Sequence, residues 1–312
     1  MEKNTHLLKG LHVVLPKGDL YEGTIRIMYK AGVPLRSDID GSVLTGHEPR
    51  DKMPADAYIA DSDSIFSLLR PQDHWSILTD SEEPVDLLVT GYDCIMDRSR
   101  IEKPRLNGQQ GALSSWEHMM KEELERIGLI ELANLRFKPS AMGLLTSRER
   151  GIRTLGDLRN YSENNGSKPI AASEYAHLMA SFLSDYDIPG EVAPITGSEE
   201  SMARYFPVVT TVSETGSSIV KRLQRLALIR NDCNGNKPVV ITRSTPCAVA
   251  TAEAYEKNKD RMDELAYRLK TARDELLDED PGLFDEKYQQ FFKYYDDIEE
   301  RKLAEAGEKD NI

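Results

Sequence analysis

The chain has 312 residues, 39% of them hydrophobic, and a net charge of −13. This composition is typical of a globular protein with room for two domains. The acidic balance argues against a nucleic-acid partner, because such proteins need a basic face to meet phosphates. No apolar run is long enough for a signal peptide or a membrane-spanning helix. We therefore expect a cytoplasmic protein that binds neither nucleic acid nor a membrane.

The spacing of the cysteines and histidines does not indicate a metal site formed by these residues. The three cysteines, Cys94, Cys233 and Cys247, are widely separated and odd in number, so they form neither a zinc pattern nor a disulfide framework. The six histidines never fall at metal-ligand spacing. We expect reduced thiols and no metal ligands from these residues.

Strands and helices alternate along most of the chain, which predicts an α/β fold with largely parallel sheets. In chain order the pattern predicts a strand at 11–15, a helix at 20–30, an irregular polar excursion at 34–64, strands at 64–69 and 85–90, a helix from a capping box at 114–117 to Gly128, a helix at 154–160, a strand at 169–172, a helix at 175–185, a strand at 191–195, a helix at 199–204, and strands at 207–212 and 238–242.

The tail after Pro246 has a different character. It carries 8 of the 13 excess negative charges, counted over residues 251–312. Apolar residues at helical spacing predict two amphipathic helices, one from Met262 to Leu276 and one from Phe284 to Ile298, broken at Asp280-Pro281-Gly282. Such a helical hairpin must bury its apolar stripe, on its own body or on a twin subunit, so we expect a homo-oligomer, a dimer or higher.

Four loops follow strands and carry polar or glycine residues: Pro16-Lys17-Gly18-Asp19, Gly91-Tyr92-Asp93, Ser173-Glu174-Tyr175 and Glu214-Thr215-Gly216-Ser217-Ser218. In open parallel sheets, ligands bind at the carboxyl ends of strands, where helix N-termini converge. The set predicts a site for a phosphorylated, hydroxyl-rich ligand. Each loop taken alone is equally compatible with a routine turn.

The last of these loops predicts a phosphate site. Residues 210–226 read as a strand, a sharp polar turn and a helix that begins in the turn. This aims the main-chain N–H groups of Gly216, Ser217 and Ser218 at an anion, on the positive end of a helix dipole. The alternative is simple N-capping by Ser or Thr.

The chain also resembles ATP phosphoribosyltransferase, the first enzyme of histidine biosynthesis. The matching segments follow the family's order: LHVVLPKGDLYEGTIRIMYKAG (11–32), LLRPQDHWSILTDSEEPVDLLVTGYD (68–93), IRTLGDL (152–158), IAASEYAHLMASFLSDYDI (170–188), and ITGSEES with VSETGSSI (195–219). The resemblance covers about 11–230, with gaps.

The resemblance implies two lobes of the type-II periplasmic-binding-protein kind with the active site between them. Lobe I would be 1–104 with a return at 227–250, lobe II 105–226 with the phosphate loop, and 251–312 a C-terminal helical extension. The implied reaction is Mg²⁺-dependent attack by N1 of ATP on C1′ of 5-phosphoribosyl 1-pyrophosphate, with release of pyrophosphate.

The resemblance also assigns roles to residues. Glu214, Thr215, Gly216, Ser217 and Ser218 would hold the 5′-phosphate. The other substrate-binding residues would be Lys17, Gly18, Asp19 and Arg70 near the pyrophosphate or nucleotide phosphates, Gly91, Tyr92 and Asp93 beside the purine, and Ser173, Glu174 and Tyr175. Lys17 and Arg70 read alternatively as a solvated cation and a strand-end ion pair. No catalytic base is identified.

Four positions depart from the family pattern. Pro207 and Thr211 stand where the family usually has acidic residues, and Asp19 and Gln72 stand where it usually has basic ones. The family's β-rich regulatory domain is absent, so histidine feedback is not expected. Two alternatives therefore stay open: transfer to a different heterocyclic or amine acceptor, and a non-catalytic ligand-binding or regulatory relative.

Overall fold

The computed structural model describes residues 7–8, 11–16, 19–33, 56–60, 85–102, 116–165, 169–195, 198–212, 225–230 and 238–284; the side chains of 19, 56–60, 100–102 and 116–120 are outside the description. The chain forms two compact units. Unit 1 holds the described residues up to 102, those of 116–138, and those from 245 onward. Unit 2 holds the described residues of 139–244.

Unit 1 is built on a five-stranded sheet in the order β2-β1-β3-β11-β4. The strands are β1 (His12–Pro16), β2 (Asp56–Ala60), β3 (Leu87–Gly91), β4 (Leu129–Asn134) and β11 (Pro246–Thr251). β1 pairs in parallel with β2 and β3, whereas β11 runs antiparallel to β3 and β4. β4 is therefore parallel to β3, and the carboxyl ends of β1, β3 and β4 lie at one edge.

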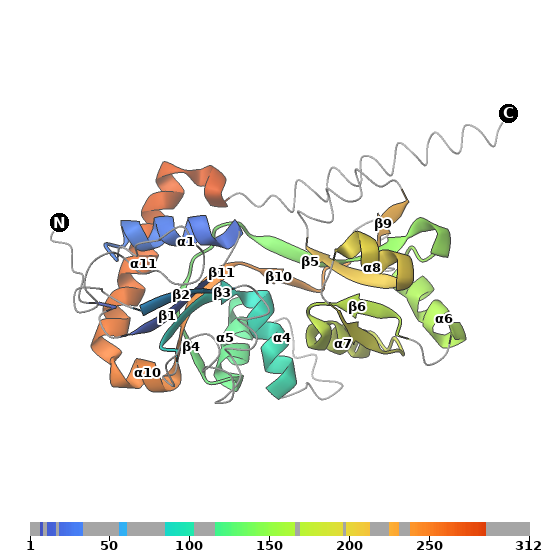
Figure 1. Cartoon of the computed structure of the whole chain (residues 1–312), viewed down its shortest axis with the longest axis horizontal. Coiled ribbons are helices and arrows are strands. Elements are labelled where there is room, and N and C mark those ends of the chain that lie inside the picture. The colour runs from blue at the N-terminus through green and yellow to red at the C-terminus, as the bar shows by residue number, and fades with distance from the viewer. Residues whose placement is uncertain are drawn as a thin grey trace. The chain divides into compact units, whose positions relative to one another are not determined.

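Helices cover both faces of this sheet. They are α1 (Asp19–Lys30), α4 (Tyr92–Glu102), α5 (Trp116–Arg126), α10 (Ala252–Lys257) and α11 (Lys259–Glu279), followed by a 3₁₀ turn at Pro281–Phe284. In Figure 1, α1 and α4 lie on opposite sides of the strands. Alternate residues of β1, Val13 and Leu15, point into the core that α1 and α11 share.

The first predicted tail helix is confirmed as α11, and it belongs to the core of unit 1. Met262, Leu265 and Leu269 are fully buried in the cluster that includes β1, β3 and α1. Ion pairs from Arg26 to Asp280 (2.9 Å) and from Lys30 to Glu279 (2.6 Å) tie α1 to the end of this helix. α11 thus packs on its own unit, whereas the predicted second helix lies outside the described residues.

Unit 2 is built on a six-stranded sheet in the order β10-β5-β8-β6-β7, with β9 paired to β5. Its elements are β5 (Ser140–Ser147), α6 (Leu155–Asn165), β6 (Ala171–Ser173), α7 (Ala176–Asp185), β7 (Val192–Pro194), α8 (Glu199–Tyr205), β8 (Val208–Val212), β9 (Leu226–Leu228) and β10 (Thr242–Ser244), with a 3₁₀ turn at Arg148–Arg150. β6 is parallel to both β7 and β8. The carboxyl ends of these three strands therefore meet at one edge.

The structure differs from the sequence expectations in three respects. Both sheets are mixed rather than largely parallel, because β11 and β5 run antiparallel to their neighbours. β4, β5, β9, β11 and α4 are additional elements, and β2 lies inside the predicted irregular excursion. The two units meet in sequence at 138/139 rather than at 104/105, because β4 pairs with β11 and so belongs to unit 1. Among the described helices, none is long and apolar enough to cross a membrane.

Candidate functional site

A polar cluster lies at the carboxyl edge of the unit 2 sheet. The hydroxyls of Ser173, the last residue of β6, and Thr210 of β8 are 2.8 Å apart. The main-chain N–H of Tyr175 donates to the Ser173 hydroxyl at 2.9 Å. Both hydroxyl residues are buried. This bond network fixes the turn from which α7 begins, and it leaves Glu174 exposed on the edge.

Glu199 adds a carboxyl group to the same edge, beside Thr211, whose side chain is on the opposite face of β8 from that of Thr210. Glu199 is the first residue of α8, which follows β7, so it reaches the edge from the third parallel strand. Burial raises the pKa of Glu199 to about 7, against the opposing hydrogen bonds from the Thr211 side chain and the Val212 main chain; the negative charge of Glu174 adds to the rise. Its Oε2 atom is buried and has no hydrogen-bond partner among the described residues. A carboxyl that titrates near neutrality can give or take a proton at physiological pH.

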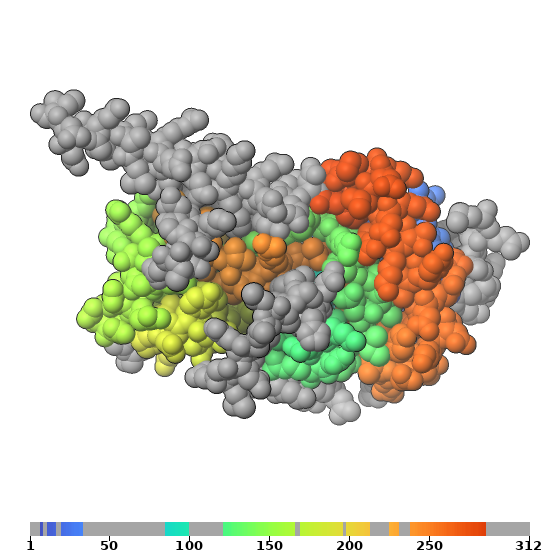
Figure 2. Space-filling model, turned by 180° about the vertical axis from the view of Figure 1, so that it is seen from behind, coloured from blue at the N-terminus to red at the C-terminus, as the bar shows by residue number. Residues whose placement is uncertain are grey.

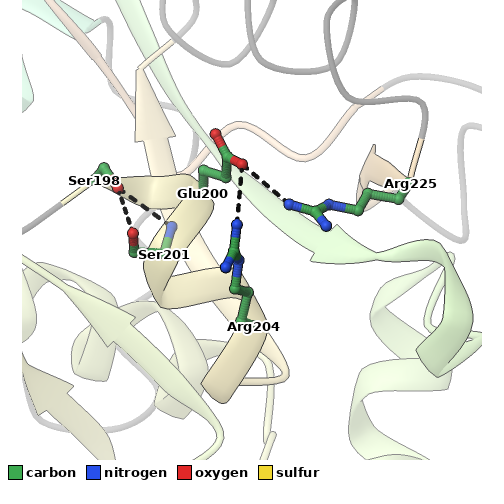
Figure 3. Close-up of polar contacts among 5 residues, drawn as sticks. All are labelled: Ser198, Glu200, Ser201, Arg204 and Arg225. Atoms are coloured by element: carbon green, nitrogen blue, oxygen red, sulfur yellow. Dashed lines mark hydrogen bonds and ion pairs between the residues drawn. The ribbon is translucent and has the colours of Figure 1, made fainter.

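The neighbouring acid, Glu200, has a structural role instead. Its Oε1 atom lies 3.4 Å from a guanidinium nitrogen of Arg204 and 3.0 Å from one of Arg225 (Figure 3). These ion pairs connect α8 with the residue that precedes β9. Ser198 caps the helix, because its hydroxyl accepts from the Ser201 N–H at 3.3 Å. Both glutamates are half-buried, but Glu200 is paired with two arginines whereas a carboxylate oxygen of Glu199 is buried without a partner among the described residues.

The predicted phosphate loop, Glu214 to Ser218, lies outside the described residues. So do Lys17, Gly18 and Arg70, and the side chain of Asp19. Their assigned roles stay predictions. The structure does place the end of β8, Val212, at the edge that carries Ser173, Thr210 and Glu199. The chain therefore enters the 214–218 segment from this cluster.

In unit 1, the predicted residues Gly91, Tyr92 and Asp93 lie where β3 ends and α4 begins. This is the edge at which parallel β1 also ends. The Tyr92 ring is buried, and its hydroxyl donates to a carboxylate oxygen of Glu131 on β4. Asp93 is also buried. The structure thus places this loop at a strand end, and the Tyr92 hydroxyl is engaged in its hydrogen bond with Glu131.

Sequence reasoning missed Glu199 as a site residue. Its segment was recognised only as ITGSEES, and an acid just after a serine N-cap is an ordinary helix start. The available signal was its position after a strand that runs parallel to β6, at the edge where ligands bind. Its hydrogen-bond partner Thr211 is in β8, which sequence spacing alone does not bring to the start of α8. Among the described residues, no three His, Cys, Asp or Glu side chains group as a metal site.

No protein-family model and no curated protein matches the chain. Solved structures do. A chain of the ATP phosphoribosyl transferase (HisG:HisZ) complex from Thermotoga maritima aligns with a TM-score of 0.51 and 14% identity, over 85% of this chain and 99% of that one. MatC from Rhodopseudomonas palustris with bound malate aligns with a TM-score of 0.47 and 9% identity, over 93% and 99%. The GluR0 ligand-binding core from Nostoc punctiforme, in complex with glutamate, gives 0.43 and 10%, over 86% and 98%. The fold of this protein is thus α/β in two units, and over 85% of its length it is similar to that of the phosphoribosyl transferase chain.

Proposed function

We propose that this protein is a phosphoribosyltransferase that transfers the phosphoribosyl group from 5-phosphoribosyl 1-pyrophosphate to a ring nitrogen of ATP, with Mg²⁺. The observation that carries the proposal is that Ser173, Thr210 and Glu199 all lie at one edge of the unit 2 sheet, the edge at which β8 ends before Glu214–Ser218. Hydroxyl and carboxyl groups suit a ribose, and the loop that follows suits its 5′-phosphate. The likeness in fold to the phosphoribosyl transferase complex is compatible with this.

Glu199 suits the chemistry of this transfer. The ring nitrogen would form a bond to C1′ while the bond from C1′ to the pyrophosphate oxygen breaks, and the electron pair leaves with pyrophosphate. Positive charge develops on the ribosyl ring, and negative carboxylates placed nearby favour it. The alkylated ring must then lose an exocyclic proton, and a carboxyl with a pKa of about 7 can accept it.

Glu199 also bears on the departures from the family pattern. Thr211 stands where the family usually has an acid, and its side chain hydrogen-bonds Glu199. The carboxyl would thus come from α8 instead of β8. Magnesium usually binds one or two carboxylates together with substrate phosphates. Glu174 fits such a role, because its side chain is exposed at this edge.

Two other functions have support. Asp19 and Gln72, in place of basic residues, favour transfer to a heterocyclic or amine acceptor that is less charged than ATP. Pro207 and Thr211, in place of acids, favour a non-catalytic ligand-binding or regulatory relative. We further propose a cytoplasmic oligomer; the structural neighbour comes from a complex, and light scattering of the purified protein would measure the assembly.

The test is pyrophosphate release from phosphoribosyl pyrophosphate with Mg²⁺, first with ATP and then with a panel of purine, azole and amine acceptors. Release with ATP supports the proposal, and release only with another acceptor supports the second function. Binding without release for every acceptor favours the third.

Two variants test the residues. Gly216→Val should abolish phosphoribosyl pyrophosphate binding, because a β-branched side chain blocks the approach of a phosphate to the main chain. Glu199→Gln should keep binding and lower kcat about 100-fold, the usual contribution of one proton-transfer group. Glu200→Gln is the matched control, and its kcat should stay at the wild-type value. Equal losses in both glutamate variants would contradict the role given to Glu199.

A further inference from the structure

Unit 1 contains a pocket of about 550 Å³ whose lining shares a single residue, Tyr92, with the substrate-binding residues that the family resemblance assigns. It lies along β4, which forms one end of the unit 1 sheet. Both α5 and α11 pack against this strand, and the pocket is lined from all three elements. Figure 2 shows α11, in orange to red, directly beside the green segment that holds α5 and β4. The volume is within the range of small-molecule sites, roughly 300–1,000 Å³.

The charge of the lining is opposite to that of the protein. Four cationic side chains line the pocket, Lys121, Arg136, Lys270 and Arg273, against two acidic ones, whereas the whole chain carries −13. Both acids already have partners. Glu125 lies 3.9 Å from Lys121, and Glu131 accepts the Tyr92 hydroxyl. The lining therefore favours an anion.

Asn134 bonds to two of these residues, but it holds the cationic group of Arg273 alone, which also forms an ion pair with Asp274 at 2.7 Å. A guanidinium nitrogen of Arg273 donates to the Asn134 carbonyl at 2.8 Å. The Arg136 N–H donates to the Asn134 side chain at 3.0 Å, in a turn where Arg136 has a φ of 59°. Lys270 is one turn before Arg273 on α11, is exposed, and has no ion-pair partner in the part of the chain that the structure describes. An anion would thus meet a positioned arginine and an available lysine.

The rest of the lining is apolar. Leu124 of α5 and Leu129 and Ile130 at the start of β4 form one wall, and the buried ring of Tyr92 lies in the lining as well. Apolar walls with a few convergent polar groups are the usual composition of a small-molecule site. Inorganic phosphate would leave this wall uncovered. A ring system that carries one anionic group would contact both parts.

We propose that the pocket along β4 binds a small organic anion, in which a phosphate or carboxylate meets Lys270 and Arg136 and a flat apolar ring meets Leu124 and Ile130. This site is separate in composition from the strand ends of unit 2. It does not depend on the proposed transfer reaction.

The test is titration calorimetry of the full-length protein with 1-anilinonaphthalene-8-sulfonate, an aromatic anion, and with its uncharged analogue N-phenyl-1-naphthylamine. We expect one site for the anion and at least tenfold weaker binding of the neutral analogue. The double variant Lys270→Glu/Arg136→Glu should weaken binding of the anion at least tenfold, because both side chains are exposed and reverse the local charge without disturbing the core.

The matched control is Lys259→Glu, an exposed lysine on the same helix α11 that does not line the pocket. It should bind the anion as the wild type does. Equal affinity of the wild type and the double variant, equal weakening in the control, or no binding to the wild type would each overturn the proposal. Competition by 1-naphthyl phosphate against 1-naphthoate then separates phosphate from carboxylate ligands. Saturating phosphoribosyl pyrophosphate should not displace the probe, whether or not the transfer activity is found.

Discussion

The strand ends of unit 2 and the pocket of unit 1 are both suited to ligands, but their charges are opposite. At the strand ends, Glu174 and Glu199 lie near hydroxyl groups, and burial raises the pKa of Glu199. Along β4, Lys270 and Arg136 line an apolar pocket. An acidic edge suits a metal ion or a ribosyl cation, and a cationic pocket suits an organic anion. The comparison teaches that the net charge of the chain, −13, does not predict the local charge of a binding site.

The largest expected effect is on unit 1. Leu269→Ala should lower the free energy of unfolding by about 3 kcal/mol, because the side chain is fully buried against the core. Urea unfolding measures this. Tyr267→Ala, on an exposed position of the same helix, is the control and should cost under about 0.5 kcal/mol. Since α11 also carries Lys270 and Arg273, the variant should lose anion binding at lower urea than the wild type. Equal stability of the two variants would show that α11 does not anchor the pocket.

The second effect concerns the strand ends of unit 2 and depends on pH. The pKa of Glu199 is about 7 in the fold, against an ordinary value of 4.5. Between these values the unfolded chain loses its proton first, so the carboxyl costs the fold increasing free energy as pH rises from 4.5 to 7. Glu199→Gln removes this cost. The variant should gain about 2 kcal/mol relative to wild type between pH 4 and pH 8, measured by urea unfolding at both pH values.

Glu200→Gln is the control for that pH series, since Glu200 is the adjacent acid and is ion-paired at the surface. Its difference from wild type should be nearly the same at pH 4 and pH 8. A pH-independent effect of Glu199→Gln would mean that the pKa of this carboxyl is near its ordinary value in the fold, which would make it a weaker proton acceptor at neutral pH.

A third effect tests the hydroxyl pair that defines the edge. Ser173→Ala should cost about 1–2 kcal/mol, because the Tyr175 N–H and the Thr210 hydroxyl lose a buried partner. In a double-mutant cycle with Thr210→Val, the two changes should couple by about 0.5–1 kcal/mol. Additive costs would show that the two hydroxyls do not interact in solution.

Local patterns were sufficient for several elements. The apolar run before Pro16 and the helix after it are confirmed as β1 and α1, and the spacing from Met262 to Leu276 is confirmed as α11. Each of these is specified by residues close together in sequence. The α/β class followed from the alternation of strands and helices along the chain, whereas the two lobes were implied by the family resemblance.

Other elements depend on information that no local pattern contains. Helix α4 carries Asp97, Arg98 and Ser99 in buried positions. Because these polar residues break the apolar spacing of an amphipathic helix, the sequence pattern did not predict this helix. β4 pairs only with β11 among the described strands. Asn134 and Thr245, which hydrogen-bond across this pair, are 111 residues apart in sequence. The hydrogen bond of Glu199 with Thr211 likewise joins α8 to β8.

The smallest effect is the ion pair at the surface of unit 2. Glu200→Gln should lower stability by less than about 0.5 kcal/mol at low salt, because its contacts with Arg204 and Arg225 are partly exposed. The difference should fade as salt is raised to about 1 M, where charges are screened within about 3 Å. A larger or salt-independent loss would place this pair among the structural supports of the strand ends.

The position of β11 in the centre of the unit 1 sheet has a consequence for synthesis of the chain. β11 lies between β3 and β4, yet it follows every described residue of unit 2 in sequence. A ribosome therefore delivers the last strand of unit 2, β10 at Thr242–Ser244, before the strand that joins β3 to β4. Unit 2 can fold while the nascent protein is still growing, whereas unit 1 must wait for its closing strand and for α11.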